Sequence, residues 1–532
     1  MSAVLDDGGG GATVEPEGPA LQRSGDRRAL LKVGAGAIAG LLVPAVARAQ
    51  GIGPRPAKSR RVIGTAAKPT MPTRTPQPTA SPSLSGWDLP ELRLARRITM
   101  GLTDTEGARA RSMGYSAYLE YHLAAEAIDD SATESFIATN YATVSQGVLQ
   151  LYNLDAGTVQ AQLASAWIYR AAFSARQLQE RAVEFWSDHF NIAITKVGYL
   201  KVVDDRDVIR KYALDTFPNL LKASAHSPAM LAYLDQTQSR NGAPNQNYAR
   251  EIMELHTLGV DGGYTQTDVA ELSRVLTGWT IAGRGTFNFD PNLHDFGAKT
   301  VLGVTIPASN RSTGAAAQAE GEQMLDVLVN HPSTASFVSK KMLRYFLSYE
   351  PTSDQVAQVA AVYKSTGGDI KAMLRTVLDA GNLTAAPAKL KRPFHLVAST
   401  LRALGPAGAI VTNVNNISRQ VTTLGQQPFV WQTPDGYPDT VEYWAGNILT
   451  RWNFASTAGS ANGADFRVDI TPFTFTTADG VVTAIGRYLF AGEMLPGLRD
   501  ELKGYLGTAL PTAARIRETI ALALSSATFQ YF

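Results

Sequence analysis

Apolar residues recur every three to four positions through most of the chain after residue 86, and this spacing limits the fold more than any other feature. A helix with that pattern buries one stripe of its surface against its neighbours. Helices are predicted over residues 90–98, 160–190 (one helix or two), 206–225, 265–277, 317–330, 335–347, 353–365, 370–380, 394–404 and 513–524. The segment from Lys299 to Ile306 alternates weakly and predicts a small hairpin. The predicted fold class is therefore mainly α, with one large multi-helix domain and a minor β hairpin.

The N-terminal segment has the order of parts of an export signal. Residues 26–32 (DRRALLK) match the twin-arginine pattern, and an apolar segment follows as far as Val46. Ala47 and Ala49 then place small residues at the two positions that a signal peptidase reads. We therefore expect a twin-arginine signal peptide over residues 1–49 and a periplasmic or extracellular location.

A linker is predicted between the signal and the helical domain. Residues 50–86 hold seven prolines and six basic side chains and no acidic one. Proline removes backbone donors and favours extended conformations, which is typical of a semi-stiff disordered spacer. The expected organisation is a signal peptide, a Pro-rich linker over residues 50–86 and a helical domain over residues 87–532. A split near residue 310 into two helical lobes is the alternative for that domain.

Composition excludes several classes of protein. The chain has no cysteine, which excludes disulfides, thiol catalysis and iron–sulfur clusters. Residues 87–532 contain 38 basic and 42 acidic side chains, so the domain is slightly acidic and nucleic acid is not an expected partner. No apolar stretch after the signal is long enough to span a bilayer, and no integral membrane span is expected once the signal is cleaved.

Two predicted helices carry a histidine on their apolar side. On a helical wheel of residues 181–192, His189 falls inside the apolar arc, whereas Arg181, Glu184 and Asp188 lie opposite. In residues 247–259, His256 and Glu251 fall inside the apolar arc, with Arg250 and Glu254 on the polar side and Gly259 placed to cap the helix. A third histidine, His294, precedes Asp295 in a loop. A buried imidazole needs a partner for each nitrogen.

Histidines and carboxylates in this number are an adequate ligand set for zinc, iron or manganese. We therefore predict His189, His256 and His294 as ligands of a divalent metal ion, and Glu251 and Asp295 as catalytic carboxylates. The same groups can act as general acid and base without a metal. The alternative stays open that the histidines are satisfied core residues and that Glu251 pairs with an arginine such as Arg250 or Arg274. Tryptophans either stack on a sugar or pack in the core, namely Trp186, Trp279, Trp431, Trp444 and Trp452.

Several longer motifs resemble one known family. They are residues 185–190 (FWSDHF), 227–235 (SPAMLAYLD), 247–259 (NYAREIMELHTLG), 277–279 (TGW), 294–295 (HD), 391–393 (KRP) and 425–438, which ends in PDGYP. In these the chain resembles the exported bacterial family catalogued as domain of unknown function eighteen hundred. The family usually has Asn-Glu-Asn where this chain has Asn245-Gln246-Asn247, and often Gly-Trp where it has Gly436-Tyr437. The resemblance implies an exported, mostly helical protein, often encoded beside a second exported protein that resembles alkaline phosphatases and sulfatases.

The resemblance supplies no reaction, so two main functional hypotheses follow. The first is an exported metal-binding hydrolase that acts on a polymer or a surface glycan. The second is a non-catalytic binding or secretion-accessory protein that works with the phosphatase/sulfatase-like neighbour. A third hypothesis, a redox protein, rests on the export route alone, because no haem, flavin or cluster signature is present.

Overall fold

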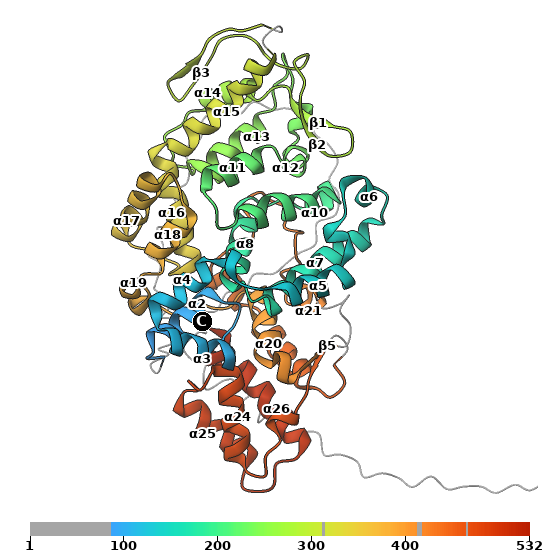
Figure 1. Ribbon diagram of the computed structural model, residues 1–532, viewed down its shortest axis with the longest axis vertical. Helices are drawn as coiled ribbons and strands as arrows, with labels where there is room; N and C mark the ends of the chain where they lie inside the picture. The colour runs from blue at the N-terminus through green and yellow to red at the C-terminus, as the bar shows by residue number, and fades with distance from the viewer. Residues whose placement is uncertain (1–86, 311–313, 412–417, 464–465) are drawn as a thin grey trace, which may run out of the picture. The chain divides into compact units, whose positions relative to one another are not determined.

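The computed structural model describes residues 87–532 apart from 311–313, 412–417 and 464–465 (Figure 1). The predicted signal peptide and linker lie outside the described residues. The described residues belong to one compact unit. Most of its elements are helices, so the prediction of a mainly α fold is confirmed. In this part of the chain, no helix is both long enough and apolar enough to cross a bilayer.

The first half of the domain is built from short and medium-length helices. They are α2 (Pro90–Ile98), α3 (Asp104–Met113), α4 (Tyr115–Leu123), α5 (Ser131–Asn140), α6 (Val148–Tyr152), α7 (Ala156–Phe173), α8 (Gln177–His189), α9 (Ile194–Val197), α10 (Leu200–Asp204), α11 (Phe217–Ala225), α12 (Pro228–Tyr233), α13 (Gln246–Glu251) and α14 (Gln266–Val275). Two π-helical segments, η3 (Asp205–Arg210) and η5 (Ile252–Thr257), continue α10 and α13.

The second half continues this helical pattern. It contains α15 (Gly314–Asn330), α16 (Pro332–Phe346), α17 (Ser353–Thr366), α18 (Ile370–Val377), α19 (Ala380–Ala385), α20 (Pro393–Gly408), α21 (Arg419–Thr423), α22 (Val441–Ala445), α23 (Ile448–Gly459), α24 (Ala478–Phe490), α25 (Pro496–Leu506), α26 (Ala513–Ser525) and α27 (Ala527–Gln530). Helix α20 packs against α7, where the rings of Trp167 and Phe394 stack with centroids 3.8 Å apart.

Most predicted helices are confirmed, and one is wrong. The predicted helix over residues 206–225 is interrupted after η3, because Thr216 caps a new helix whose first turn contains Pro218. The stretch 160–190 forms two helices, α7 and α8. A capping box begins α14: the Thr265 hydroxyl accepts from the Asp268 amide at 3.2 Å, and the Asp268 carboxylate accepts from the Thr265 amide at 2.8 Å.

Strands occur as three antiparallel pairs in the described part of the chain. The predicted hairpin is confirmed as β3 (Lys299–Val301) paired with β4 (Val304–Ile306). A second hairpin, β1 (Trp279–Ala282) with β2 (Thr286–Phe289), was not predicted from the sequence. The third pair joins the distant segments β5 (Ala409–Val411) and β6 (Phe466–Val468).

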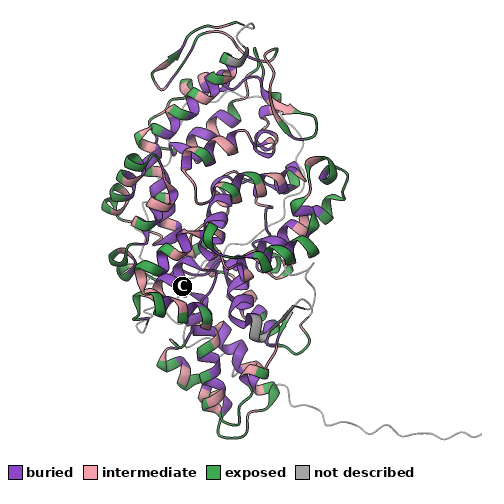
Figure 2. Cartoon of the chain, in the orientation of Figure 1, coloured by how far each residue is buried: buried purple, intermediate pink, exposed green. Residues whose placement is uncertain are grey.

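Helix α8 lies in the core, and its burial differs from the prediction. Figure 2 shows buried residues in purple, and α8 is buried along nearly its whole length. Arg181 and Glu184, which the helical wheel places on the polar side, are only 2% and 1% exposed. That prediction is wrong because a wheel treats a charged residue as solvent-facing, whereas here tertiary partners neutralise both charges.

Candidate functional site

A cavity of about 270 Å³, lined by both aromatic and charged side chains, lies between α8, α16 and the loop that follows Pro434. Helix α8 contributes Asp188 and His189 to its lining, and α16 contributes Lys341 and Arg344. Arg392, just before α20, and the loop residues 435–440 complete the wall. Three of the sequence motifs thus meet around one cavity: FWSDHF at residues 185–190, and KRP and PDGYP at 391–393 and 434–438, both 200 or more residues later in the chain.

A buried ion cluster supports one wall of this cavity. Arg392 forms ion pairs with Glu184 and, at 2.6 Å, with Asp188. Glu184 also pairs with Arg181 at 3.0 Å and accepts a hydrogen bond from the Tyr345 hydroxyl. Burial raises the pKa of Asp188, and the neighbouring Glu184 adds to that effect against the attraction of Arg392. Removing one member would leave buried charge without compensation, so the cluster fixes the positions of the α8 side chains.

The loop after Pro434 approaches α8 very closely. Gly436 has a φ of +76°, and a Cβ atom added there would lie 2.2 Å from the backbone oxygen of Asp188. The next amide, of Tyr437, donates to Asp188 at 3.4 Å. The preceding carboxylate, of Asp435, accepts from the Trp431 indole at 3.2 Å. The loop is non-helical and forms part of the cavity wall.

His189 and His256 are neighbours, as their predicted burial requires. Each is 1% exposed, and their ring centroids lie 6.2 Å apart. Nε2 of His189 donates to the backbone oxygen of His256 at 3.1 Å, since a carbonyl can only accept. Nδ1 of His189 and Nε2 of His256 are buried and have no hydrogen-bond partner within the described part of the domain. Burial lowers the pKa of His189 well below its usual value and that of His256 to about 3, so both rings are neutral.

The backbone around His256 departs from α-helical geometry. His256 lies in the π-helical segment η5, which continues α13 after Glu251. A π-turn is rare and often occurs at functional sites. Gly259, predicted as the cap, has a φ of +82° just after this segment.

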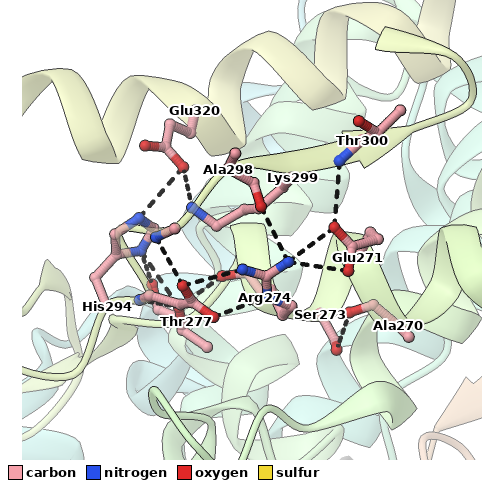
Figure 3. Close-up of polar contacts among 12 residues, drawn as sticks. Ala270, Glu271, Ser273, Arg274, Thr277, His294, Ala298, Lys299, Thr300 and Glu320 are labelled. Atoms are coloured by element: carbon pink, nitrogen blue, oxygen red, sulfur yellow. Dashed lines mark hydrogen bonds and ion pairs between the residues drawn. The ribbon is translucent and has the colours of Figure 1, made fainter. Parts of the chain in front are cut away.

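His294 lies in a separate polar cluster (Figure 3), and the Asp295 amide joins it by donating to the Thr277 hydroxyl at 2.8 Å. Nδ1 of His294 donates to the Thr277 backbone oxygen at 2.7 Å, and Nε2 lies 3.3 Å from the Glu320 carboxylate. Glu320 also accepts from the buried amine of Lys299 at 2.7 Å. Both imidazole nitrogens therefore lie at hydrogen-bond distance from protein oxygen atoms of this cluster.

Asp295 is held by Arg274. Nε of Arg274 donates to one carboxylate oxygen at 2.8 Å, and the Gly297 amide donates to the other at 2.9 Å. Burial alone would raise the pKa of Asp295, but the Arg274 guanidinium and the Gly297 amide lower it. Arg274 also pairs with Glu271, as Figure 3 shows, so these contacts join α14 to the loop before β3.

Glu251 differs from Asp295 because its carboxyl group is free of such contacts. It is half-buried at the end of α13, and within residues 87–532 as described it makes no hydrogen bond or ion pair. Burial is the main cause of its raised pKa; the like charges of Glu254 and Asp435 raise the pKa further, and the charge of Arg250 lowers it in part. The alternative in which Glu251 pairs with Arg250 or Arg274 does not occur, since Arg250 donates to Gln266 and Arg274 to Asp295.

The predicted metal ion does not fit the ligands that these residues offer. Among the described residues, no three histidine or carboxylate groups lie close enough together to hold an ion. His189 and His256 contribute two open nitrogens, but His294 is engaged elsewhere. A structural or catalytic zinc site needs at least three protein ligands. We derive no chemical step through a metal.

Metal content is therefore a direct test. The purified chain is expected to contain well below one zinc, iron or manganese ion per molecule by mass spectrometry. His189→Ala and His256→Ala are expected to leave that amount unchanged. One ion per chain, lost in both folded variants and kept in His331→Ala, would contradict this expectation and restore the predicted site.

Sequence reasoning missed four charged residues of the cavity wall: Lys341, Arg344, Asp435 and Asp439. Lys341 and Arg344 lie in a helix that the sequence predicts without assigning it any functional role. Charged residues on a predicted helix are as typical of a solvent-exposed face as of a binding site. Asp435 was inside a quoted motif, PDGYP, and its neighbouring glycine was the available signal of a close backbone approach.

Comparison with known proteins agrees with the motifs. The family model described as "Protein of unknown function (DUF1800)" matches residues 93–531. The searches of curated proteins and of solved structures gave no match. Since the matched region spans nearly the whole helical domain and includes the segments around the cavity, the chain belongs to the DUF1800 family.

Proposed function

We propose that this protein is an exported hydrolase that acts on a polymer such as a surface glycan, and that its active site comprises the cavity and Glu251. One observation carries the proposal. Glu251 is a half-buried carboxyl group with no hydrogen bond or ion pair among the described residues, and a nearby carboxylate, Asp435, lines the cavity and raises its pKa.

Two carboxyl groups with different environments are what glycoside hydrolysis requires. One must be protonated to donate to the leaving oxygen, and the other must be ionised to activate water or attack the sugar. Glu251, with its raised pKa, suits the role of the acid. Asp435, which accepts hydrogen bonds from Trp431 and Thr433 that fix its position, suits the role of the second carboxyl group.

Aromatic side chains next to the cavity favour a sugar as the ligand. Tyr437 lines the cavity, and its ring centroid lies 4.8 Å from that of Trp431. Trp431 in turn contacts Tyr443, which is 47% exposed. Partly exposed aromatic rings beside polar groups provide both an apolar face and hydrogen-bonding positions for a sugar ring.

Glu251→Gln tests this proposal. The assay measures new reducing ends released from a panel of cell-surface polysaccharides. The variant is expected to lose about 10²- to 10⁴-fold in turnover, the usual contribution of a general acid, without losing stability. Asp261→Asn, an exposed carboxylate close by in the chain, is the matched control and is expected to keep full activity.

The pH dependence of activity provides a second test, because it would not depend on Glu251 if that residue had only a structural role. Activity needs protonated Glu251, so it should fall as the pH rises through the pKa of that group. Glu254→Gln removes a like charge that raises this pKa, and should shift the alkaline limb to lower pH while keeping the maximal rate. Binding of a glycan without any release of reducing ends would overturn the hydrolase and favour the non-catalytic accessory of a neighbouring exported protein.

A further inference from the structure

Two cations on one side of α16 line the cavity without a protein partner. Lys341 and Arg344 are three residues apart and therefore lie on the same face of the helix. Neither side chain forms an ion pair or hydrogen bond with the described part of the chain; the Lys341 amine lies 5.6 Å from the Phe337 ring centroid. Like charges at this spacing destabilise a helix unless a counter-charge is present.

The other full charges of the cavity wall contrast with this pair. Arg392 is neutralised by Asp188 at 2.6 Å and by Glu184. Asp439 is neutralised by Lys389 at 2.8 Å. Asp435 accepts two hydrogen bonds within its own loop. The charge that is left without a direct contact on α16 is therefore positive, and it faces the interior of the cavity.

Groups from each adjoining element act on Lys341. Asp188 of α8 and Asp435 of the loop attract the ammonium group, whereas Arg344 on the same helix repels it. His189 and His256 face it as neutral rings. Burial is the largest influence and lowers the pKa of Lys341 to about 8. An anionic group placed between Lys341 and Arg344 would offset both the burial and the repulsion.

We propose that the cavity binds an acidic saccharide, whose carboxylate or sulfate group pairs with Lys341 and Arg344. The saccharide part of the proposal rests on the proposed function, while the anionic part rests on the two unpaired cations. An arginine fork and a lysine point charge on adjacent turns match an oxyanion with two or three oxygens. The aromatic ring of Tyr437, in the same wall, would contact the sugar ring that carries this group.

Binding of defined oligosaccharides to the full chain tests the proposal by calorimetry. The probes are an oligogalacturonate, a sulfated galactan oligomer and a neutral galactan oligomer of equal length. The acidic probes are expected to bind, and which of the two binds more tightly identifies the group. Lys341→Met and Arg344→Met should each weaken that binding about tenfold or more, whereas Lys340→Met, an exposed lysine on the same helix, should not change it.

The pH dependence gives a second, independent readout. Affinity for the acidic probe should decrease as the pH rises through about 8, because the Lys341 amine loses its proton there. Lys341→Arg should bind the acidic probe, unlike Lys341→Met, and its affinity should not decrease above this pH, since arginine stays charged.

Each remaining outcome is decisive. Equal affinity of the wild type for neutral and acidic oligomers, or no binding of either acidic probe by the folded chain, would overturn the proposal. So would tight binding that survives both Lys341→Met and Arg344→Met. Glu251→Gln separates this inference from the proposed function: a variant that binds the acidic probe but releases no product supports both, and a wild type that binds without hydrolysis overturns only the hydrolase.

Discussion

Replacing Arg392 with methionine is expected to lower the free energy of unfolding by about 3–5 kcal/mol. Arg392 is 4% exposed and pairs with Glu184 and Asp188, which are themselves members of the buried wall of the cavity. The variant would leave Asp188 without its ion-pair partner and Glu184 with only Arg181. A buried charge without a partner of opposite sign is costly. Methionine fills the volume of the arginine side chain but provides no positive charge. Urea denaturation measures the change.

A surface pair provides the control for this result. Arg375 contacts Glu120 at 2.6 Å, but both side chains are about half exposed. Solvent screens such a pair, so Arg375→Met should change stability by less than about 1 kcal/mol. Arg392→Lys keeps the charge and loses the two-pronged geometry, so we expect an intermediate loss. If Arg392→Met were no more destabilising than Arg375→Met, the ion cluster would not support the cavity.

Gly436→Ala is expected to destabilise the protein by about 3 kcal/mol or more and to displace the loop after Pro434. Two costs combine at this position. A φ of +76° is unfavourable for any residue with a Cβ atom, by about 1–2 kcal/mol. The added atom would also lie 2.2 Å from the Asp188 backbone oxygen, which belongs to a buried helix and has no room to move. Thermal unfolding measures the loss, and weaker binding of a cavity ligand should accompany it.

Gly367→Ala separates these two costs. Gly367 has a φ of +66°, but nothing lies within 4 Å of the position its Cβ would take. It therefore reports backbone strain alone, about 1 kcal/mol. Equal losses in Gly436→Ala and Gly367→Ala would mean that the loop moves away from α8 at no cost, contrary to the close packing described here.

The helical fold was largely predictable because its signals are local. Capping at Thr265, the proline near the start of α2 and the spacing of apolar residues depend only on neighbours in the chain. Predictions failed where distant residues decided the outcome. The wheel places Glu184 in solvent, yet Arg392 and Tyr345, each more than 150 residues away, bury and neutralise it. The wheel also assumes α-helical rotation through His256, where the helix is π.

The candidate site divides in the same way. The sequence by itself determined that His189 and His256 would be buried, because the spacing of their apolar neighbours places both on the apolar side of a helix. It could not determine which histidines meet. In the tertiary structure His189 lies beside His256, and His294 contacts Glu320 instead. Glu251 lies within electrostatic reach of Asp435.

The two cations of the cavity wall likewise could not be predicted from the sequence. Lys341 and Arg344 look like ordinary charges on an amphipathic helix, because spacing along one helix records which face a residue occupies but not what packs against it. Only the packing of α8 and the loop after Pro434 against α16 places these two cations in the wall of a cavity. Residue identity therefore determined the export pattern and the helical fold, whereas contacts between distant segments decided which charges remain free to meet a ligand.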